Sequence, residues 1–334
     1  SSLSIETPNA PRVVDATGAT DLAGGRPVEA GDALVVATSG STGAAKGVVL
    51  THDAVAASAV ATSLRLAVDP DRDRWLACLP LAHVGGLSVV TRALHTGTPL
   101  MVHPAFDASE VDRSDATLVS LVATAMRRVD TTRWRVIVLG GAHAPDDRPP
   151  NSVTTYGMTE TGSGVVYDGR PLDGVEVRVA DGEVQLRAPM LLRCYRDGTD
   201  PRLTDGWFPT GDLGELTDDR RLVVHGRRGD LIISGGENVW PEPIERLLAT
   251  HPLVADVGVA GVPDPEWGAV VTAYVVPRDP AALPNPAALL DSLRDLVRGH
   301  LPAYCAPRNV VIVDQVPRTT LGKLKRGELV DRHG

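Results

Sequence analysis

The sequence predicts an α/β protein: a large N-terminal domain of helix-covered, mostly parallel sheets with a small antiparallel β unit, followed by a small α+β C-terminal domain. Three observations predict this class. In the first half of the chain, apolar runs typical of strands alternate with amphipathic stretches typical of helices. Between Gly174 and Val224 the pattern changes to short alternating strands, and helices return after Gly226. We expect residues 1–229 and 230–334 to form the two domains.

Strands in the first half of the chain are predicted at five apolar runs: Ala33–Ala37, Trp75–Leu79, Leu100–Val102, Thr117–Leu121 and Arg135–Leu139. We expect the first run to be a buried strand. Because helical stretches alternate with these strands, the sheet should be mostly parallel and covered by helices.

Three helices are predicted between these strands: from Thr51 or Asp53 to about Leu66, from about Leu87 to Gly97, and Ala125–Val129. Thr51 and Asp53 are suitable N-caps, because their side-chain oxygens can accept a hydrogen bond from a helix N-terminal amide. Gly97 is a suitable helix end, because glycine takes the left-handed conformation without steric cost.

The remaining elements are predicted from turn signals and periodicity. Asp181-Gly182 predicts a type I′ hairpin turn in the antiparallel unit. The charged, glycine-bounded segment Gly226–Asp230 predicts a hinge. The C-terminal domain should contain two helices and two strands: Pro241–Thr250, Ala287–His300, a strand around Val257, and Val270–Val276.

The composition excludes several functional classes. The 334 residues carry 33 Lys and Arg against 42 Asp and Glu, a net charge of −9, which disfavours binding to nucleic acids and anionic membranes. Cys78, Cys194 and Cys305 show no CxxC spacing, so neither a zinc site nor a disulfide framework is indicated. The sequence indicates no signal peptide and no apolar stretch long enough to span a bilayer, and we expect a cytoplasmic protein.

Lysine is scarce among the basic residues. Lys46, Lys323 and Lys325 are the three lysines, and the other basic residues are arginines. A coding bias explains the general replacement of Lys by Arg. A lysine retained against such a bias is a candidate for a site that needs a compact ammonium group.

The strongest motif is Thr38-Ser-Gly-Ser-Thr-Gly-Ala-Ala-Lys-Gly47, which follows a predicted strand. Its small hydroxyl and glycine residues can curl around a phosphate, and Lys46 adds a cation. It is not a Walker A loop, because Gly47 stands where that loop has its magnesium-binding Ser or Thr. The alternative, an ordinary flexible loop, is less consistent with the strand–loop–lysine order.

Four further motifs follow along the chain: Tyr156–Glu160, Trp207–Gly214, Gly226–Glu245 and Pro317–Lys323. In the first, Tyr156 could stack on a purine, and Thr159 and Glu160 offer the hard oxygen ligands that Mg²⁺ prefers. In the second, Asp212 is suited to accept hydrogen bonds from ribose hydroxyls. Taken alone, Tyr156–Glu160 could be an ordinary turn with one buried aromatic residue.

These five motifs, in this order, resemble the core motifs of the acyl-adenylate-forming superfamily, which contains acyl-CoA synthetases, adenylation domains and luciferases. The resemblance extends from Asp32 to Leu329. It implies that the N-terminal domain binds ATP, Mg²⁺ and a carboxylic acid and forms an acyl-AMP with release of pyrophosphate. It also implies that the small C-terminal domain is mobile and that a thiol then attacks the acyl-AMP.

The resemblance also implies a role for each matching residue. The loop of Thr38, Ser39, Gly40, Ser41, Thr42, Gly43 and Lys46 would hold the β- and γ-phosphates. Adenine would be framed by Gly140, Gly141, Ala142, Tyr156 and Gly157. Thr159 and Glu160 would bind the α-phosphate and Mg²⁺. Asp212 and Arg227 would bind the ribose. Asp230 matches the hinge position, and Lys323 matches the catalytic lysine that reaches the carboxylate and the α-phosphate.

The acid and the acceptor are predicted from the segment Leu79–Gly86, which lies where this superfamily builds its acyl pocket and contains His83 and Gly85. A lone histidine is otherwise more often a core residue than a ligand. Because no acidic residue stands between Leu79 and Val90 to bind an α-ammonium group, we expect an acid without one. CoA is the expected acceptor, with Gly235 and Gly236 allowing pantetheine to approach the backbone.

Two features resemble the short o-succinylbenzoate–CoA ligases of menaquinone biosynthesis. Only 37 residues precede Thr38, and the chain contains the segment Leu-Pro-Leu-Ala-His-Val. Thr124, Gly162 and Ser163 would then line the acid pocket. Two alternatives stay open: a CoA ligase for another aryl or medium-chain acid, and a non-catalytic acyl-AMP-binding protein. We expect small-molecule partners only, and a monomer or homodimer.

Overall fold

The computed structural model describes residues 3–5, 12–15, 18–21, 29–38, 46–141, 147–282, 285–318 and 324–333, and within these ranges the side chains from Glu29 to Arg332. The chain divides into two units. Unit 1 comprises Ser1–Arg178, Gln185–Pro209 and Leu216–Val223, and unit 2 comprises Val179–Val184, Thr210–Glu215 and Val224–Gly334. The boundary predicted at residues 229 and 230 stays a prediction.

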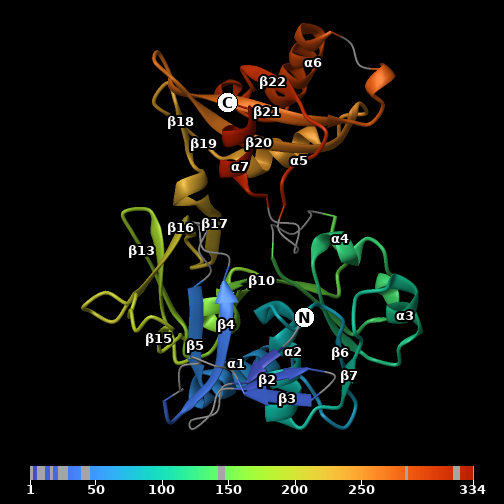
Figure 1. Ribbon diagram of the computed structural model, residues 1–334, viewed down its shortest axis with the longest axis vertical. Coiled ribbons are helices and arrows are strands. Elements are labelled where there is room, and N and C mark those ends of the chain that lie inside the picture. The colour runs from blue at the N-terminus through green and yellow to red at the C-terminus, as the bar shows by residue number, and fades with distance from the viewer. Residues whose placement is uncertain are drawn as a thin grey trace. The chain divides into compact units, whose positions relative to one another are not determined.

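A seven-stranded sheet with the order β12-β11-β10-β9-β8-β6-β7 is the centre of unit 1 (Figure 1). Five of its strands are parallel: β6 (Trp75–Ala77), β7 (Leu100–Val102), β8 (Leu118–Leu121), β9 (Val136–Leu139) and β10 (Ser152–Met158). The antiparallel strands β11 (Ser163–Tyr167) and β12 (Arg170–Pro171) complete it. The predicted α/β class with a mostly parallel sheet is confirmed.

Helix α1 (His52–Arg65) precedes β6, and three helices lie between consecutive parallel strands: α2 (Val84–Thr96), α3 (Ala108–Arg113) and α4 (Ala123–Met126). The predicted caps are present, because Thr51 accepts a hydrogen bond from the amide of Ala54 at 3.1 Å and Gly97 ends α2 with a φ of 68°. Helix α2 begins before Leu87, its predicted start. A Cβ atom at Gly86 within this helix would lie 2.5 Å from the carbonyl oxygens of Leu79 and Pro80, so the close packing requires glycine.

An antiparallel hairpin of β4 (Asp32–Thr38) and β5 (Lys46–Thr51) encloses the predicted phosphate loop. With β15 (Cys194–Tyr195) it forms a sheet of order β15-β5-β4. Strand β5 was not predicted from the sequence. The expectation of a buried first strand is wrong: Val36 alone is buried in β4, and Val35 is 38% exposed, because Val35 and Ala37 lie on the opposite, exposed face of the strand.

The antiparallel unit predicted between Gly174 and Val224 is a four-stranded sheet of β13 (Glu176–Ala180), β14 (Glu183–Arg187), β16 (Phe208–Leu216) and β17 (Leu222–Arg227). Asp181 and Gly182 have φ values of 50° and 75°, as a type I′ turn requires. A further antiparallel sheet, not predicted from the sequence, consists of β1 (Leu3–Ile5), β2 (Arg12–Asp15) and β3 (Gly18–Asp21).

A five-stranded sheet lies in unit 2, with β18 (Ile232–Ser234), β19 (Glu237–Val239), β20 (Val254–Asp264), β21 (Gly268–Pro277) and β22 (Asn309–Ile312). Its helices are α5 (Pro241–Leu248), α6 (Pro286–Arg298) and α7 (Arg326–His333). The two predicted helices and two predicted strands are present, whereas β18, β19, β22 and α7 were not predicted. Leu248, Val259 and Leu293 are fully buried in the core between sheet and helices.

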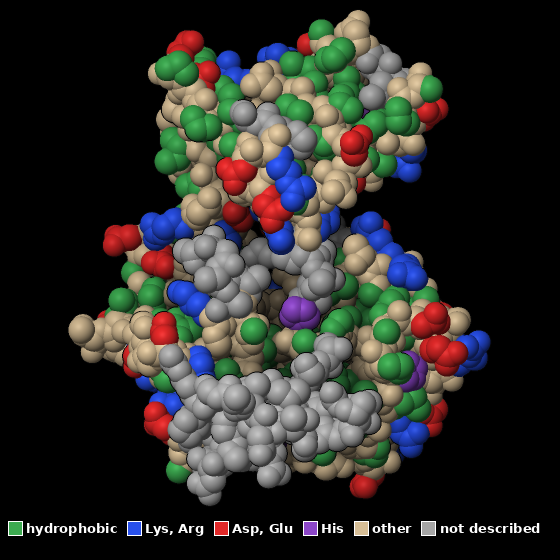
Figure 2. Space-filling model, in the orientation of Figure 1, with side chains coloured by type: hydrophobic (Ala, Val, Ile, Leu, Met, Phe, Trp, Pro, Cys, Tyr) green, Lys and Arg blue, Asp and Glu red, His purple; other side chains and the backbone are tan. Residues whose placement is uncertain are grey.

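Acidic and basic side chains are interspersed on the face shown in Figure 2. Many charged side chains of the described residues form local ion pairs, such as Arg221 with Asp219 and Arg332 with Glu328. Among the residues that the structure describes, no helix is long and apolar enough to cross a membrane.

Candidate nucleotide and acid site

Several predicted site residues of unit 1 lie at the carboxyl edge of its parallel strands. His83 follows β6, Thr124 follows β8, Gly140 follows β9, and Tyr156 lies near the end of β10. Neighbouring parallel strands present their carboxyl ends at one edge of a sheet, so the topology brings these four positions to the same edge.

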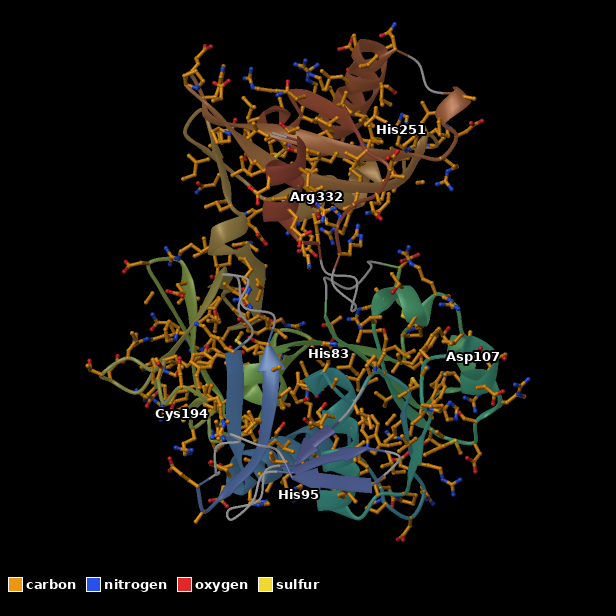
Figure 3. The ribbon with its side chains drawn as sticks, in the orientation of Figure 1. His83, His95, Asp107, Cys194, His251 and Arg332 are labelled. Carbon is orange, nitrogen blue, oxygen red and sulfur yellow. The ribbon has the colours of Figure 1, made fainter. Side chains whose placement is uncertain are left out.

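The strand order reverses between β6 and β8, because β7 lies on one side of β6 and β8 on the other. Ligands of open α/β sheets bind in the crevice outside such a reversal. His83, which immediately precedes α2 (Figure 3), and Thr124 in α4 follow the two strands that flank it. His83 is half-buried, and Gly85 and Thr124 are exposed.

The residues predicted to frame adenine occupy the ends of β9 and β10. The amide of Gly140 donates to the carbonyl of Leu121 at 3.1 Å, and Gly141 has a φ of 98°. Tyr156 is half-buried, and Ala142 lies outside the described residues. Gly157 has a structural reason to be glycine, because a Cβ atom there would lie 2.2 Å from the carbonyl oxygen of Ser163.

Thr159 and Glu160 lie in a 3₁₀ turn, Thr159–Thr161, directly after β10. Gly162 ends the turn with a φ of 67°. The carboxylate of Glu160 accepts a hydrogen bond of 3.0 Å from the hydroxyl of Tyr195, and its carbonyl accepts one of 2.8 Å from the amide of Leu192. No motif in the sequence distinguishes Tyr195, so it was not predicted as a site residue.

Lys46 is exposed at the start of β5, where it pairs with Thr38 across the hairpin. Its Nζ atom lies 4.9 Å from the centre of the Tyr195 ring. The amide and hydroxyl of Thr199 lower the pKa of the nearby Asp197, and the charge of Lys46 contributes to this shift. The loop residues Ser39, Gly40, Ser41, Thr42 and Gly43 lie outside the described residues.

Arg92 of α2 places a buried guanidinium group beside the predicted acid pocket. The residue is 2% exposed, and its Nη2 atom donates to the hydroxyl of Ser163 at 3.1 Å. Its guanidinium lies 4.7 Å from the centre of the Trp75 ring, and Nη1 has no hydrogen-bond partner among the described residues. Burial lowers the pKa of Arg92. The sequence analysis did not identify Arg92, since one arginine in an amphipathic helix gives no signal.

In unit 2, the two residues predicted to bind ribose are brought together. Arg227 Nε lies 2.8 Å from Asp212 Oδ1, and Arg227 Nη1 donates to the carbonyl of Thr210 at 2.8 Å. Asp212 is 6% exposed. The ion pair therefore fixes a carboxylate and a guanidinium side by side.

The predicted hinge and pantetheine residues also lie in unit 2. Asp230, in the 3₁₀ turn Arg228–Asp230, is ion-paired with Arg326. Gly235 has a φ of 60°, and a Cβ atom there would lie 2.6 Å from the Trp267 ring; Gly236 has a φ of 86°. Lys323 lies outside the described residues.

The described residues contain no group of three or more His, Cys, Asp or Glu side chains that could hold a metal ion. Mg²⁺ commonly binds through one or two carboxylates together with substrate phosphates and water. Glu160, a single carboxylate in a polar turn, fits an ion carried by a nucleotide. It does not fit an all-protein metal cage.

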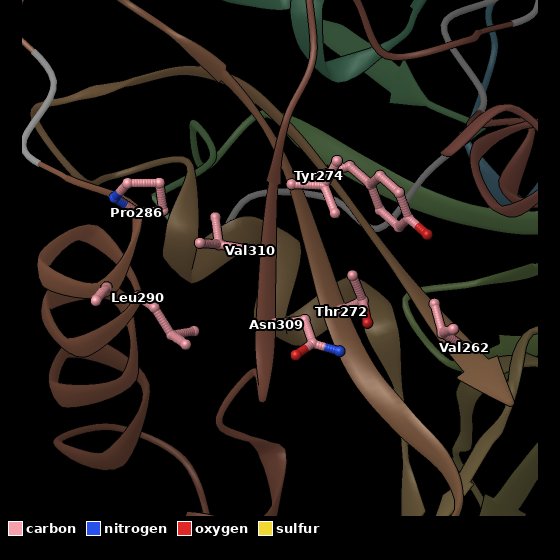
Figure 4. A pocket seen from close by; sticks show the side chains of 9 residues that line it. Val262, Thr272, Tyr274, Pro286, Leu290, Asn309 and Val310 are labelled. Atoms are coloured by element: carbon pink, nitrogen blue, oxygen red, sulfur yellow. The ribbon is translucent and has the colours of Figure 1, made fainter. Parts of the chain in front are cut away.

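A pocket of about 470 Å³ opens in unit 2 between β20, β21, β22 and α6 (Figure 4). Val262, Tyr274 and Leu290 are among the side chains that line it. None of the predicted site residues does so.

Comparison with protein families gives two matches. Residues 6–195 match the family described as AMP-binding enzyme. Residues 243–323 match the AMP-binding enzyme C-terminal domain.

Relatives with assigned functions are similar over most of this chain. The 2-succinylbenzoate–CoA ligase of Listeria monocytogenes is 33% identical over 335 residues, which cover 90% of this chain and 70% of the relative. The o-succinylbenzoate CoA synthetase of Bacillus subtilis, solved with the acyl-adenylate intermediate OSB-AMP, is 33% identical to this chain, with a TM-score of 0.79. The match covers 88% of this chain and 68% of the synthetase chain. The same synthetase has also been solved with ATP and a magnesium ion, and that structure matches with 32% identity and a TM-score of 0.79. This match covers 91% of this chain and 72% of the synthetase chain.

Proposed function

Because the chain belongs to the AMP-binding enzyme family, we propose that it is an AMP-forming acid–thiol ligase that converts o-succinylbenzoate to its CoA thioester. In the first step, the acid carboxylate attacks the α-phosphate of ATP and pyrophosphate leaves, giving an acyl-AMP. In the second step, the CoA thiol attacks the acyl carbon and AMP leaves. ATP, Mg²⁺ and CoA are thus the small molecules that the reaction needs.

Cations are the main catalytic requirement of the first step, because it brings an anionic carboxylate to an anionic phosphate. We assign Lys46 to the β- and γ-phosphates and Lys323 to the carboxylate and α-phosphate. Glu160 and Thr159 would hold the Mg²⁺, which neutralises phosphate charge when bound. Asp212 and Arg227 are assigned to the ribose, and Gly140, Gly141 and Tyr156 to the adenine.

The observation that carries the choice of acid is the buried pair of Arg92 and Ser163. Burying a charge without a counter-charge costs several kcal/mol. No carboxylate is ion-paired with Arg92 among the described residues, and its Nη2 atom donates to the hydroxyl of Ser163, which we expect to line the acid pocket. A substrate with a second carboxylate near Ser163 would supply the counter-charge. o-Succinylbenzoate has one, on its aromatic ring.

The relatives support the same acid, since their names specify 2-succinylbenzoate. His83 and Thr124, at the strand-order reversal, are assigned to the walls of the acid pocket with Gly85 and Gly162. Gly235 and Gly236 are assigned to pantetheine. The cytoplasmic location and the monomeric or homodimeric state remain predictions.

ATP–pyrophosphate exchange with a panel of carboxylic acids tests this function, followed by CoA-dependent release of AMP. We expect exchange with o-succinylbenzoate that exceeds exchange with simple aryl or medium-chain acids. Exchange only with those other acids would identify a different CoA ligase. Binding of acyl-AMP without exchange for any acid would identify a non-catalytic binding protein.

A further inference from the structure

Tyr195 contacts two side chains that the proposed function assigns to the nucleotide. Its hydroxyl donates to Glu160 Oε1 at 3.0 Å, and the face of its ring lies 4.9 Å from Lys46 Nζ. All three residues belong to unit 1, and they come from β15, the turn after β10 and the start of β5. One phenol side chain therefore links the exit of the phosphate loop to the predicted magnesium ligand.

We propose that Tyr195 is a positioning residue for adenylation, which orients the Glu160 carboxylate toward Mg²⁺ and the Lys46 ammonium group toward the phosphates. The inference rests on the proposed function, because it uses the roles assigned there to Glu160 and Lys46.

The backbone around Tyr195 is fixed at several points. Tyr195 pairs with Val48 across β15 and β5, and its amide donates to the carbonyl of Thr199 at 2.8 Å. The amide of Leu192 donates to the carbonyl of Glu160 at 2.8 Å. Backbone hydrogen bonds thus hold the Cα atoms of Tyr195 and Glu160 near each other, and the bond between phenol and carboxylate joins their side chains.

The hydroxyl restricts Glu160 without consuming its binding capacity. An ionised carboxylate has two oxygens and about four lone-pair positions. Tyr195 occupies a position on Oε1, so Oε2 is available to a metal ion. A glutamate side chain held in one rotamer loses less conformational entropy when the ion binds.

The ring face orients Lys46 without neutralising it. A cation over an aromatic face is attracted by the ring quadrupole, and the pair keeps a full positive charge. A carboxylate in the position of Tyr195 would cancel that charge and compete with the phosphates. A neutral residue that contacts both an ammonium group and a carboxylate therefore preserves both charges for MgATP.

Two variants separate the contributions of the hydroxyl and the ring. Tyr195→Phe removes the bond to Glu160 and keeps the ring under Lys46. We expect the Mg²⁺ concentration for half-maximal pyrophosphate exchange to rise roughly threefold to tenfold, with KM for ATP at saturating Mg²⁺ unchanged. Tyr195→Leu removes the ring as well, and we expect KM for ATP to rise in addition.

A binding measurement complements the kinetics. ATP with Mg²⁺ should raise the melting temperature of the wild type more than ATP with EDTA does. In Tyr195→Phe we expect this Mg²⁺-dependent difference to shrink, while the melting temperature without ligands stays the same.

Two matched controls are available. Tyr304→Phe changes an exposed tyrosine of unit 2 and should alter neither measurement. Tyr167→Phe removes a buried hydroxyl that lies 3.2 Å from the hydroxyl of Thr62, and should lower the melting temperature without changing the Mg²⁺ dependence.

A wild-type Mg²⁺ dependence in Tyr195→Phe would overturn the inference. A lowered melting temperature with equal losses in adenylation and in thioester formation from supplied acyl-AMP would overturn it too, since that pattern belongs to a purely structural residue. If wild-type protein exchanges pyrophosphate with no acid, the proposed function fails. The ATP-binding measurement still tests Tyr195 in that case.

Discussion

The guanidinium group of Arg326 lies 3.0 Å from the carboxylate of Asp230, the residue predicted as the hinge. Its second amino group lies 2.8 Å from Glu245, and its Nε donates to the carbonyl of Val259. Arg326 and Glu245 are 16% and 15% exposed at their side chains. Burial raises the pKa of Glu245, and the charge of Arg326 opposes this shift. The start of α7 is thus joined to the hinge residue and to α5 within unit 2.

Replacing Arg326 should destabilise unit 2. Arg326→Met leaves Glu245 buried without its counter-charge, and we expect a loss of about 3 kcal/mol in the free energy of unfolding. Urea unfolding measures it. Arg332→Met is the matched control in the same helix, because its pair with Glu328 is exposed, and it should leave the unfolding midpoint unchanged. Equal midpoints for the two variants would contradict the prediction.

Asp73 should make stability depend on pH in the acid range. The side chain is 2% exposed and accepts hydrogen bonds from Arg135 and Thr117, both at 2.8 Å, and from the amide of Asp69 at 2.9 Å. Burial tends to raise the pKa of Asp73, but these donors, with Arg135 foremost, outweigh it and lower the pKa.

A carboxyl group with a lowered folded-state pKa stabilises the fold above its unfolded pKa of about 3.9, and this contribution disappears as pH falls through the folded-state value. We therefore expect the free energy of unfolding of the wild type to be about 2 kcal/mol larger than that of Asp73→Asn at neutral pH. The difference should shrink as the pH falls below about 4. Urea unfolding of both proteins across this range measures it, and a constant difference would contradict the assignment.

Lys323 should matter for one half-reaction only. Lys323→Ala removes the cation that offsets repulsion between carboxylate and α-phosphate, and we expect acyl-AMP formation to fall by a factor of at least about 100. Thioester formation from supplied acyl-AMP should be largely retained. Comparable losses in both half-reactions would show that the lysine does not have this role.

Lys46 should not tolerate arginine. The guanidinium group is wider and flatter than an ammonium group, and we expect Lys46→Arg to raise KM for ATP about tenfold or more. Lys325→Arg is the matched control, because Lys325 is exposed and paired with Glu328, and it should behave as wild type. Near-normal kinetics for Lys46→Arg would leave coding bias as the explanation for its retention.

Arg92 should discriminate between acids by their second carboxylate. Arg92→Met should lower kcat/KM for o-succinylbenzoate by roughly tenfold or more. It should have little effect with benzoylpropionate, the same acid without the ring carboxylate. Pyrophosphate exchange with the two acids measures the ratio, and equal losses for both would indicate that Arg92 only supports the fold.

Local signals in the sequence predicted their structures well. Gly97 and Asp181-Gly182 specify helix-end and hairpin conformations through their own backbone preferences. Strand β5 was missed because Lys46–Thr51 becomes a strand by pairing with β4 and β15, which the segment itself does not encode. The start of α2 was predicted too late in the chain, after Gly85 and Gly86, because glycine is a weak helix former. The packing of Gly86 against Leu79 and Pro80 outweighs that preference.

The site residues divide in the same way. Lys46, Glu160 and Asp212 stand in recognisable motifs, so the sequence predicts a role for each of them. The contacts on which we base the roles of Tyr195 and Arg92 join them to residues 35 and 71 positions away, Glu160 and Ser163. Such relations depend on how strands and helices are arranged in space, and a single sequence does not specify them.

Thr38 and Lys46, at the two ends of the predicted phosphate loop, pair with each other across the β4–β5 hairpin. Both ends of the predicted loop are thus anchored in one ladder, and the next helix, α1, begins only after β5. Changes of length or sequence between these anchors need not shift the register of any strand. The phosphate affinity that we assign to this loop can therefore be changed by substitutions within it at little cost in folding stability.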